Sequence, residues 1–489
     1  MGKFIMHKRK FNVLIIEDNN SLSQYISNEF LKLGDDIEIT IAACRNEAIE
    51  LLESNNNFFD YITLDLTLPI TTNDFEKKPE NGLEILSKIS ELSKGTPVLI
   101  LTATSTINMI QNFLSHSNNI DIWGSKEKIS TVSHLSKLEI SSLHEIIQKI
   151  YIHFSKILSV EIRTFQSLDL PIEHDRLIRI FVNSVGGSIG KIKQIGGGFS
   201  DAKVYAVEVD DINGSKIYNS ICKCGKDIDI DIDANNYKKY INRLAPDASP
   251  RIFGHYQFGA KSSNGVFYGF AEKHNDSYFQ AMCENRISKE LFSYIKSIFT
   301  PWHNTSTTKS DTITNIRRML INDQKTEELI KQYDIENCSK TFEKKNVRYK
   351  HSCIHSDLHG ENILLNTESN KAVIIDYGDI NEGAIILDII TLECSALFHP
   401  SIKNYLDLGD WPTNIDIDNW NIEEQYIKDC PFPESVIFCR SWLKDLDIGN
   451  RELAAGLYSY SLRQLKYPET NKKVAISLIK KAYKLYELS

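Results

Sequence analysis

Five side chains suited to phosphoryl chemistry stand at or just after the ends of short apolar segments: Glu17 with Asp18, Asp65, Thr102 and Lys126. Three carboxylates can hold a Mg²⁺ ion, which prefers oxygen ligands. Such an ion would withdraw charge from an incoming phosphoryl group, so that the carboxylate of Asp65 could attack it. The hydroxyl of Thr102 and the ammonium of Lys126 suit the phosphoryl oxygens, one by hydrogen bond and the other by charge.

A second group of polar residues lies in the last third of the chain. Residues 355–362 read HSDLHGEN before an apolar segment, and a second apolar segment ends in Asp376. Phosphoryl transfer from a nucleotide to a hydroxyl needs a carboxylate that orients the acceptor and oxygen ligands for Mg²⁺. Asp357 supplies the first, and Asn362 and Asp376 supply the second.

The same transfer needs groups that hold the nucleotide phosphates. Lys223, on a predicted strand, is placed to reach them as a cation. A glycine-rich loop precedes that strand, and its glycines let the backbone approach phosphate and present N–H groups to it. The loop consists of Gly196, Gly197, Gly198, Phe199 and Ser200.

The first group depends on a regular alternation of elements over residues 12–158. A last helix is predicted from Ser142, which forms a capping box with Glu145, to Leu158. Strands are predicted at 13–16, 37–42, 61–66, 98–102 and 120–123. This alternation predicts a parallel five-stranded sheet with helices on both faces. Ligand sites of such sheets lie beyond the carboxyl ends of the strands, where the five side chains emerge.

Residues 12–158 resemble the receiver domains of two-component systems. The strings VLIIEDN, ITLDLTLP and LILTATS match that family's pattern in order and placement. The resemblance implies a flavodoxin-like fold, phosphorylated by a histidine kinase or a phosphotransfer protein. It also implies roles for single residues: phosphoacceptor Asp65, metal ligands Glu17, Asp18 and Asp65, switch hydroxyl Thr102, switch aromatic Trp123 and phosphate-binding Lys126.

Two features depart from the receiver pattern. The loop from Pro69 to Gly82 carries the insertion ITTNDFEKKPEN, and Glu127 follows Lys126 where the family has proline. Neither removes a reacting group. A degenerate receiver used only for docking is the alternative.

Residues 190–489 resemble the protein-kinase-like superfamily. The aminoglycoside-phosphotransferase branch is closest, because His359 stands two residues after Asp357 where protein kinases carry lysine. The resemblance implies ATP and Mg²⁺ as cofactors and Asp357 as the catalytic base. Asn362 and Asp376 would be metal ligands. Structural roles fall to His355, His359 and Asp388.

One departure concerns the partner of Lys223. Such kinases pair this lysine with a glutamate of the next helix, but no glutamate occurs between Lys223 and Glu272. A carboxylate of the run from Asp227 to Asp233 would have to substitute, and that run has strict period two, which predicts an extended, solvated edge. A pseudokinase that binds nucleotide without transferring phosphate is therefore the alternative to an enzyme.

Composition narrows the class of protein. The chain has 489 residues, 42% of them hydrophobic, and a net charge of −9, which argues against a nucleic-acid surface. Nine cysteines in no repeated spacing predict reduced thiols in a cytoplasmic protein. No segment approaches the ~20 apolar residues that span a bilayer, so we expect no membrane partner.

Four domains or segments are predicted: a receiver at 1–158, a helical connector at 159–189, a β-rich kinase-like lobe at 190–275 and a helical lobe at 276–489. The expected function is that of a response regulator whose phosphorylation at Asp65 controls phosphate transfer from ATP to a hydroxyl acceptor, which the sequence does not identify. The helix from Ser142 to Leu158 is the expected carrier of the signal, through docking or homodimerisation.

Overall fold

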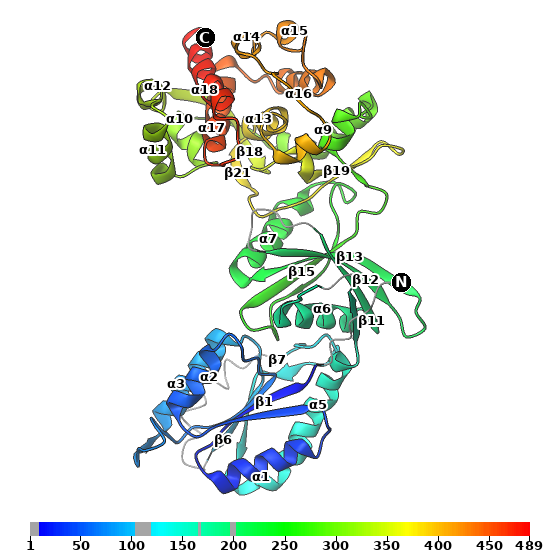
Figure 1. Ribbon diagram of the computed structural model, residues 1–489, viewed down its shortest axis with the longest axis vertical. Coiled ribbons are helices and arrows are strands. Elements are labelled where there is room, and N and C mark those ends of the chain that lie inside the picture. The colour runs from blue at the N-terminus through cyan, green and yellow to red at the C-terminus, as the bar shows by residue number, and fades with distance from the viewer. Residues whose placement is uncertain (1–8, 103–118, 165–167, 196–201) are drawn as a thin grey trace. The chain divides into compact units, whose positions relative to one another are not determined.

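The computed structural model describes residues 9–102, 119–164, 168–195 and 202–489 (Figure 1). The glycine-rich loop predicted at 196–200 lies outside these ranges. The described chain forms two units, one containing residues up to 231 together with 252–270 and the other containing residues 232–251 and 271–489.

The first unit begins with a parallel sheet of order β2-β1-β3-β6-β9. Successive residues of β1 enter opposite cores, Val13 and Ile15 on one face and Leu14 and Ile16 on the other. Helices α1 and α5 cover the first face, and α2 and α3 cover the second. The flavodoxin-like fold predicted from the sequence is confirmed. Its elements are β1 (Phe11–Ile16), α1 (Asn20–Leu31), β2 (Ile37–Ala42), α2 (Arg45–Glu53), β3 (Tyr61–Asp65), α3 (Pro79–Leu92), β6 (Val98–Thr102), β9 (Val132–Ser136) and α5 (Leu143–Leu158).

The fifth strand of this sheet differs from the predicted one. The segment predicted as that strand, 120–123, belongs to a short ribbon in which β7 (Asn119–Ile120) pairs with β8 (Ile129–Ser130). A turn follows β7, where the Asp121 carboxylate accepts the N–H groups of Ser125 and Lys126. The strand β9, which reads VSHLS, completes the sheet instead. Its polar composition gave little apolar alternation to recognise.

The first unit also contains an antiparallel sheet of order β10-β11-β12-β13-β15-β14, in which only β10 and β11 run parallel. Helix α6 (Ile172–Ser184) packs on it, with Phe181 stacked 4.1 Å from Phe267. The stretch predicted as a connector, 159–189, therefore contributes a strand and a helix to this layer. The strands are β10 (Glu161–Thr164), β11 (Ile189–Ile195), β12 (Lys203–Asp210), β13 (Lys216–Lys226), β14 (Ile252–Tyr256) and β15 (Ser263–Gly269).

The aspartate-rich run is a helix, α7 (Asp227–Lys239), and not the predicted extended edge. Aspartates in the first turn of a helix are stabilised by its dipole. Ile230, Asp233 and Ala234, which share one helical face, are buried. Burial of that face, which the period-two pattern does not reveal, selects the helix.

The second unit is mostly helical and holds two small sheets, β16-β19-β20 and β17-β18-β21. Its centre is α13, whose ten residues are all buried. Gly456 of α17 lies so close to Ile386 of α13 that a Cβ at this glycine would come within 2.6 Å of the isoleucine side chain. None of the helices in the described ranges has the length and apolar character needed to cross a membrane.

Bounds in the second unit are as follows. Its strands are β16 (Asp276–Ser277), β17 (Thr307–Thr312), β18 (Asn346–Ile354), β19 (Ile363–Asn366), β20 (Lys371–Ile374) and β21 (Asn381–Ala384). Its helices after α7 are α8 (Tyr278–Cys283), α9 (Lys289–His303), α10 (Ile313–Arg318), α11 (Asp323–Gln332), α12 (Glu336–Phe342), α13 (Ile386–Ser395), α14 (Asn414–Asp418), α15 (Glu423–Tyr426), α16 (Pro433–Asp445), α17 (Asn450–Gln464) and α18 (Lys472–Glu487).

A buried carboxyl on α17 predicts a pH-dependent stability. Glu452 accepts the N–H of Lys350 on β18 at 2.9 Å, and burial raises the pKa of its carboxyl from 4.5 to about 7. A raised folded-state pKa means that its contribution to stability is full below pH 4.5 and is lost as the pH rises through 7. Glu452→Gln, which is neutral throughout, should remove about 1–3 kcal/mol of the decrease in unfolding free energy between pH 5 and pH 8.

Urea denaturation of both proteins at the two pH values measures this difference. Parallel pH profiles for the wild type and the glutamine variant would show that Glu452 is not the group responsible.

Candidate functional site

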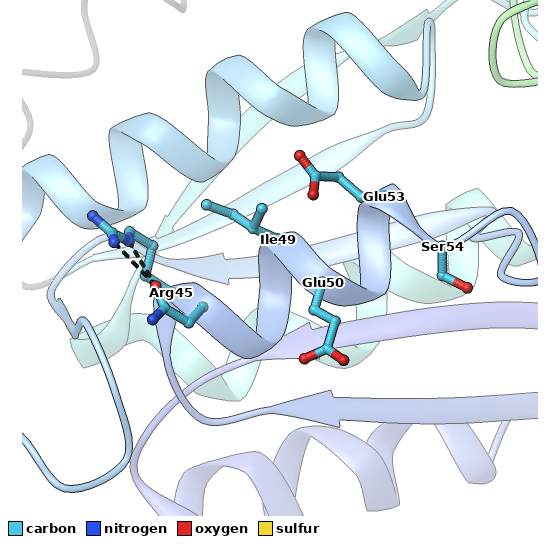
Figure 2. Close-up of a pocket in the computed structure, with 6 residues that line it drawn as sticks. Arg45, Ile49, Glu50, Glu53 and Ser54 are labelled. Carbon is cyan, nitrogen blue, oxygen red and sulfur yellow. Dashed lines mark hydrogen bonds between the residues drawn. The ribbon is translucent and has the colours of Figure 1, made fainter.

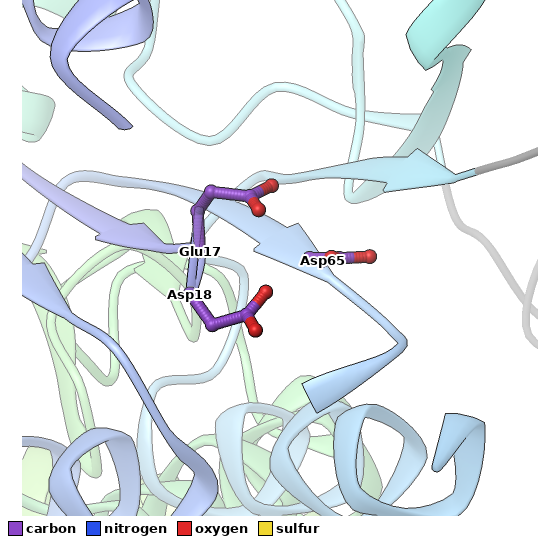
Figure 3. Close-up of side chains that lie close together, drawn as sticks. All are labelled: Glu17, Asp18 and Asp65. Carbon is purple, nitrogen blue, oxygen red and sulfur yellow. The ribbon is translucent and has the colours of Figure 1, made fainter. Parts of the chain in front are cut away.

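Three carboxylates meet at the carboxyl edge of the parallel sheet (Figure 3). Glu17 and Asp18 follow β1, Asp65 ends β3, and one oxygen of each lies within 4.8 Å of the others. Glu17 and Asp65 are buried, and burial raises the pKa of both carboxyls. Hard oxygen donors gathered in this way suit Mg²⁺, so the residues predicted as metal ligands fit that ion.

Lys137, which follows β9, contacts two carboxylates of this cluster. Its Nζ lies 2.7 Å from Asp65 Oδ2 and 2.8 Å from Glu17 Oε2. Burial acts to lower the pKa of Lys137, but the two carboxylates outweigh it and the pKa is raised. Lys137 is therefore a fixed cation where a phosphoryl group on Asp65 would need one.

The prediction that Lys126 fills this role is corrected. Lys126 is exposed, has a φ of 64°, and lies in the turn after β7. The prediction followed from placing the fifth strand at 120–123. The signal that could have found Lys137 is a lysine directly after a short segment with apolar residues at 132 and 135.

The two residues predicted as switch positions, Thr102 and Trp123, lie in different surroundings. Thr102 ends β6 beside Ser136 of β9 and is buried. Trp123 is 1% exposed and packs edge-on against Phe154 of α5, so it is a core residue. The position three residues before Lys137 belongs to His134, which is exposed on β9. The switch-aromatic role predicted for Trp123 remains a prediction.

In the second unit, Asp388 holds the loop that carries Asp357. Its carboxylate accepts the N–H groups of His355 at 2.7 Å and Ser356 at 2.8 Å, and burial raises its pKa to about 6. His355 also contacts the carbonyl of Ile375 at 3.0 Å through Nε2. Ser356 has a φ of 67°, a strained conformation that these hydrogen bonds hold in place. His355 and Asp388, for which structural roles were predicted, thus both make contacts that hold this loop.

Asp357 contacts two basic side chains. Its Oδ1 accepts a 2.8 Å hydrogen bond from Arg463 of α17, and its Oδ2 lies 3.5 Å from His359 Nε2. Burial lowers the pKa of His359 to about 4, so this imidazole is neutral near pH 7. Asn362 donates to the carbonyl of Asp357 at 2.8 Å, which closes the loop on itself. Arg463 was not among the predicted site residues, because no local spacing links it to a residue 106 positions away.

The turn that begins at Asp376 is held from α7. Asp376 has a φ of 64°, and the carbonyls of Tyr377 and Gly378 both accept hydrogen bonds from Asn236 at 2.9 Å. Asn236 was not predicted to have a role. The pairing of Asn362 with Asp376 around a metal remains a prediction.

Lys223 lies on β13 between β12 and β15, in register with Val204 and Val266. Its role towards nucleotide phosphates remains a prediction, as does that of the glycine-rich loop. The buried Asp233 is on α7 of the second unit.

A hollow of about 540 Å³ lies elsewhere, on the outer face of α2 (Figure 2). Its lining includes Arg45, whose guanidinium donates to Asn46, together with Ile49 and two glutamates. It is a shallow surface depression that contains none of the residues of either group. We assign it no function.

Comparison with known proteins agrees with the first site. Residues 13–120 match the family model of the response regulator receiver domain, which confirms that resemblance for this segment. A search of curated proteins found no match.

Three solved structures illustrate the similarities. A response regulator receiver domain protein from Clostridium thermocellum is 17% identical, with a TM-score of 0.21, over 29% of this chain and 98% of that one. An aminoglycoside-3'-phosphotransferase of type VIII is 13% identical, with a TM-score of 0.33, over 56% of this chain and 93% of that one. A putative fructosamine-3-kinase from Haemophilus somnus is 13% identical, with a TM-score of 0.33, over 62% and 95%.

The contacts of Lys137 predict which lysine supports phosphorylation. Lys137→Gln should slow the labelling of Asp65 by acetyl phosphate by about 10-fold or more, because the phosphoryl oxygens lose a partly buried cation. The matched control is Lys126→Gln, which should label at the wild-type rate. Labelling is followed by intact-protein mass spectrometry in Mg²⁺. Slow labelling of the Lys126 variant with normal labelling of the Lys137 variant would reverse the assignment.

Proposed function

We propose that the chain is a response regulator in which a phosphoryl group on Asp65 controls transfer of the ATP γ-phosphoryl group to a hydroxyl acceptor by the second unit. The observation that carries the first half is the three-carboxylate cluster with Lys137 bridging Glu17 and Asp65. The proposal for the second unit rests on the loop around Asp357, which Asp388 holds through two hydrogen bonds.

At the first site, one carboxylate oxygen of Asp65 forms a bond to phosphorus while the bond between phosphorus and the donor's leaving group breaks. The donor is a phosphohistidine of a histidine kinase or of a phosphotransfer protein. Lys137 is positioned to neutralise the transferred oxygens. Glu17, Asp18 and Asp65 would hold a Mg²⁺ ion, which would supply further charge neutralisation.

At the second site, the acceptor oxygen bonds to the γ-phosphorus, ADP leaves, and Asp357 takes the acceptor's proton. Arg463 orients the carboxylate through Oδ1 and leaves Oδ2 beside the neutral His359. Asn362 and Asp376 would hold Mg²⁺, which neutralises the phosphates. Lys223 and the loop at 196–200 would bind the nucleotide.

Contacts within the first unit support a route between Asp65 and the antiparallel sheet. Helix α5, proposed from the sequence as the carrier, meets α6, where Arg176 lies 4.7 Å from the Phe154 ring and 2.7 Å from Asp60. Asn183 of α6 donates to the carbonyl of Trp123 at 2.8 Å. Helix α6 in turn packs on the sheet that carries Lys223. A shift of α5 would therefore be transmitted to that sheet.

The second candidate is a scaffold that binds nucleotide without transfer. The ion pair of Arg463 with Asp357 favours it, because the guanidinium already occupies Oδ1 of the carboxylate that an acceptor hydroxyl would need. The two candidate functions differ in one product, because ADP forms only if the phosphoryl group is transferred.

The catalytic role of Asp357 predicts a loss of turnover without a loss of binding. In Mg²⁺ and ATP, with a panel of hydroxylated acceptors, Asp357→Asn should lower ADP formation about 100-fold or more, since the proton of the acceptor has no base to receive it. The ATP-induced rise in melting temperature should persist in this variant. ADP formation at equal rates in both proteins would exclude Asp357 as the base, and thermal stabilisation without ADP in the wild type would support the scaffold.

Control by the receiver predicts a dependence on Asp65. Beryllofluoride, which mimics an aspartyl phosphate, should change the rate of ADP formation, or the ATP-induced thermal shift, at least two-fold in the wild type. Asp65→Asn should abolish the response without altering the basal value. An unchanged rate and thermal shift in the wild type, with beryllofluoride shown to be bound, would exclude the coupling.

A further inference from the structure

The inserted loop after β3 places a lysine on the acidic cluster. In this loop β4 (Leu68–Pro69) pairs antiparallel with β5 (Lys77–Lys78), so that Pro69 faces Lys77 across a short ribbon. The ammonium group of Lys77 contacts the carboxylate of Asp18. Asp18 is one of the three carboxylates that fit Mg²⁺.

The ribbon is fixed at its base, so this contact is not that of a freely moving surface side chain. Asn81 of α3 donates to the carbonyl of Leu68 at 2.7 Å, in a buried hydrogen bond. The N–H of Gly82 donates to the carbonyl of Leu66, and a Cβ on this glycine would come within 2.3 Å of the Leu66 Cα. Both ends of the insertion are therefore held against the end of β3.

The tip of the insertion is also closed. The backbone N–H and the hydroxyl of Thr71 both donate to Asp74, at 2.8 and 2.9 Å. These hydrogen bonds shorten the stretch of free chain between β4 and β5. They help to hold Lys77 in line with Asp18.

Lysines now pair with every carboxylate of the cluster. Lys137 contacts Glu17 and Asp65, and Lys77 contacts Asp18. With both lysines the three carboxylates carry a net charge of −1, whereas with Lys137 alone they would carry −2. A divalent cation approaching the cluster therefore meets a weaker attraction and one carboxylate already engaged.

The exposed fractions of the Lys77 and Asp18 side chains show which of the two can leave the ion pair. The Lys77 side chain is 47% exposed, whereas that of Asp18 is 12% exposed. Lys77 can withdraw its ammonium into water with little loss of solvation. Asp18 stays at the end of β1. Because exposed ion pairs are weak, the contact is of a kind that a divalent ion can displace.

We propose that Lys77 is a resident competitor for Mg²⁺ at Asp18, which lowers the affinity of the receiver for the ion and is released from Asp18 when the ion binds. This inference rests on the proposed Mg²⁺ site of the first unit. It gives the insertion a role: the readiness of Asp65 to accept phosphate depends on the Mg²⁺ concentration through one displaceable lysine.

The test compares two neighbouring lysines of β5. Lys77→Gln should tighten Mg²⁺ binding about 5- to 10-fold, because the carboxylate of Asp18 no longer carries a competing cation. The matched control is Lys78→Gln, whose lysine pairs with Glu76 at 2.9 Å and with no residue of the cluster. It should bind Mg²⁺ within two-fold of the wild type.

Isothermal titration of the full chain without nucleotide measures the affinity, and Asp18→Asn identifies the heat that belongs to the receiver. An unchanged or weaker affinity in the Lys77 variant overturns the role of Lys77 and leaves the Mg²⁺ site standing. Absence of any Asp18-dependent heat in the wild type overturns both the site and the competitor.

Hydrogen exchange supplies a second readout that does not depend on the size of the heat. Adding Mg²⁺ should accelerate exchange of the backbone amides at 70–78 in the wild type, because the ribbon loses its contact with Asp18. In the Lys77 variant these amides should exchange rapidly from the start and respond little. Slower exchange of the ribbon on Mg²⁺ binding would contradict the release.

Discussion

Like charges held close together are the constraint on which the first site depends. Three carboxylates lie within 4.8 Å at the end of a parallel sheet, two of them buried. Burial disfavours the ionised forms of Glu17 and Asp65, so a cation must approach these two carboxylates if they are to stay charged. Lys137 meets this need, and Lys77 contacts Asp18. Metal binding and phosphorylation at this site both act on these three ion pairs.

The second site depends on a different constraint, which is the backbone conformation of two of its residues. Ser356 and Asp376 both have positive φ values, which non-glycine residues adopt only under constraint. The Asp388 carboxylate restrains the first through two N–H groups, and Asn236 restrains the turn after the second through two carbonyls. The loop that carries Asp357 is thus restrained from α13, and the turn at Asp376 is restrained from α7, so each depends on a helix distant from it in sequence.

The two sites also differ in how far local pattern could identify them. Asp65, Asp357 and Asp388 belong to strings whose order and spacing indicated their positions, and each lies in the expected element. Lys137 follows a strand with too few apolar residues to show the period of a strand. Helix α7 was predicted as an extended edge, because alternating Asp and Ile imitate period two. Burial of one helical face decided the structure of α7, and pairing with β6 decided that of β9.

By itself, the sequence determined the parallel α/β fold of the first 158 residues, the three carboxylates at its edge and the loop chemistry around Asp357. Regular apolar periods and short motifs encode these features locally. Only the tertiary structure decided that Lys137 contacts Glu17 and Asp65, that Lys77 contacts Asp18 and that Arg463 contacts Asp357. Each of these contacts joins residues between 59 and 120 positions apart, and their proximity depends on strand order and helix packing, which local spacing does not encode.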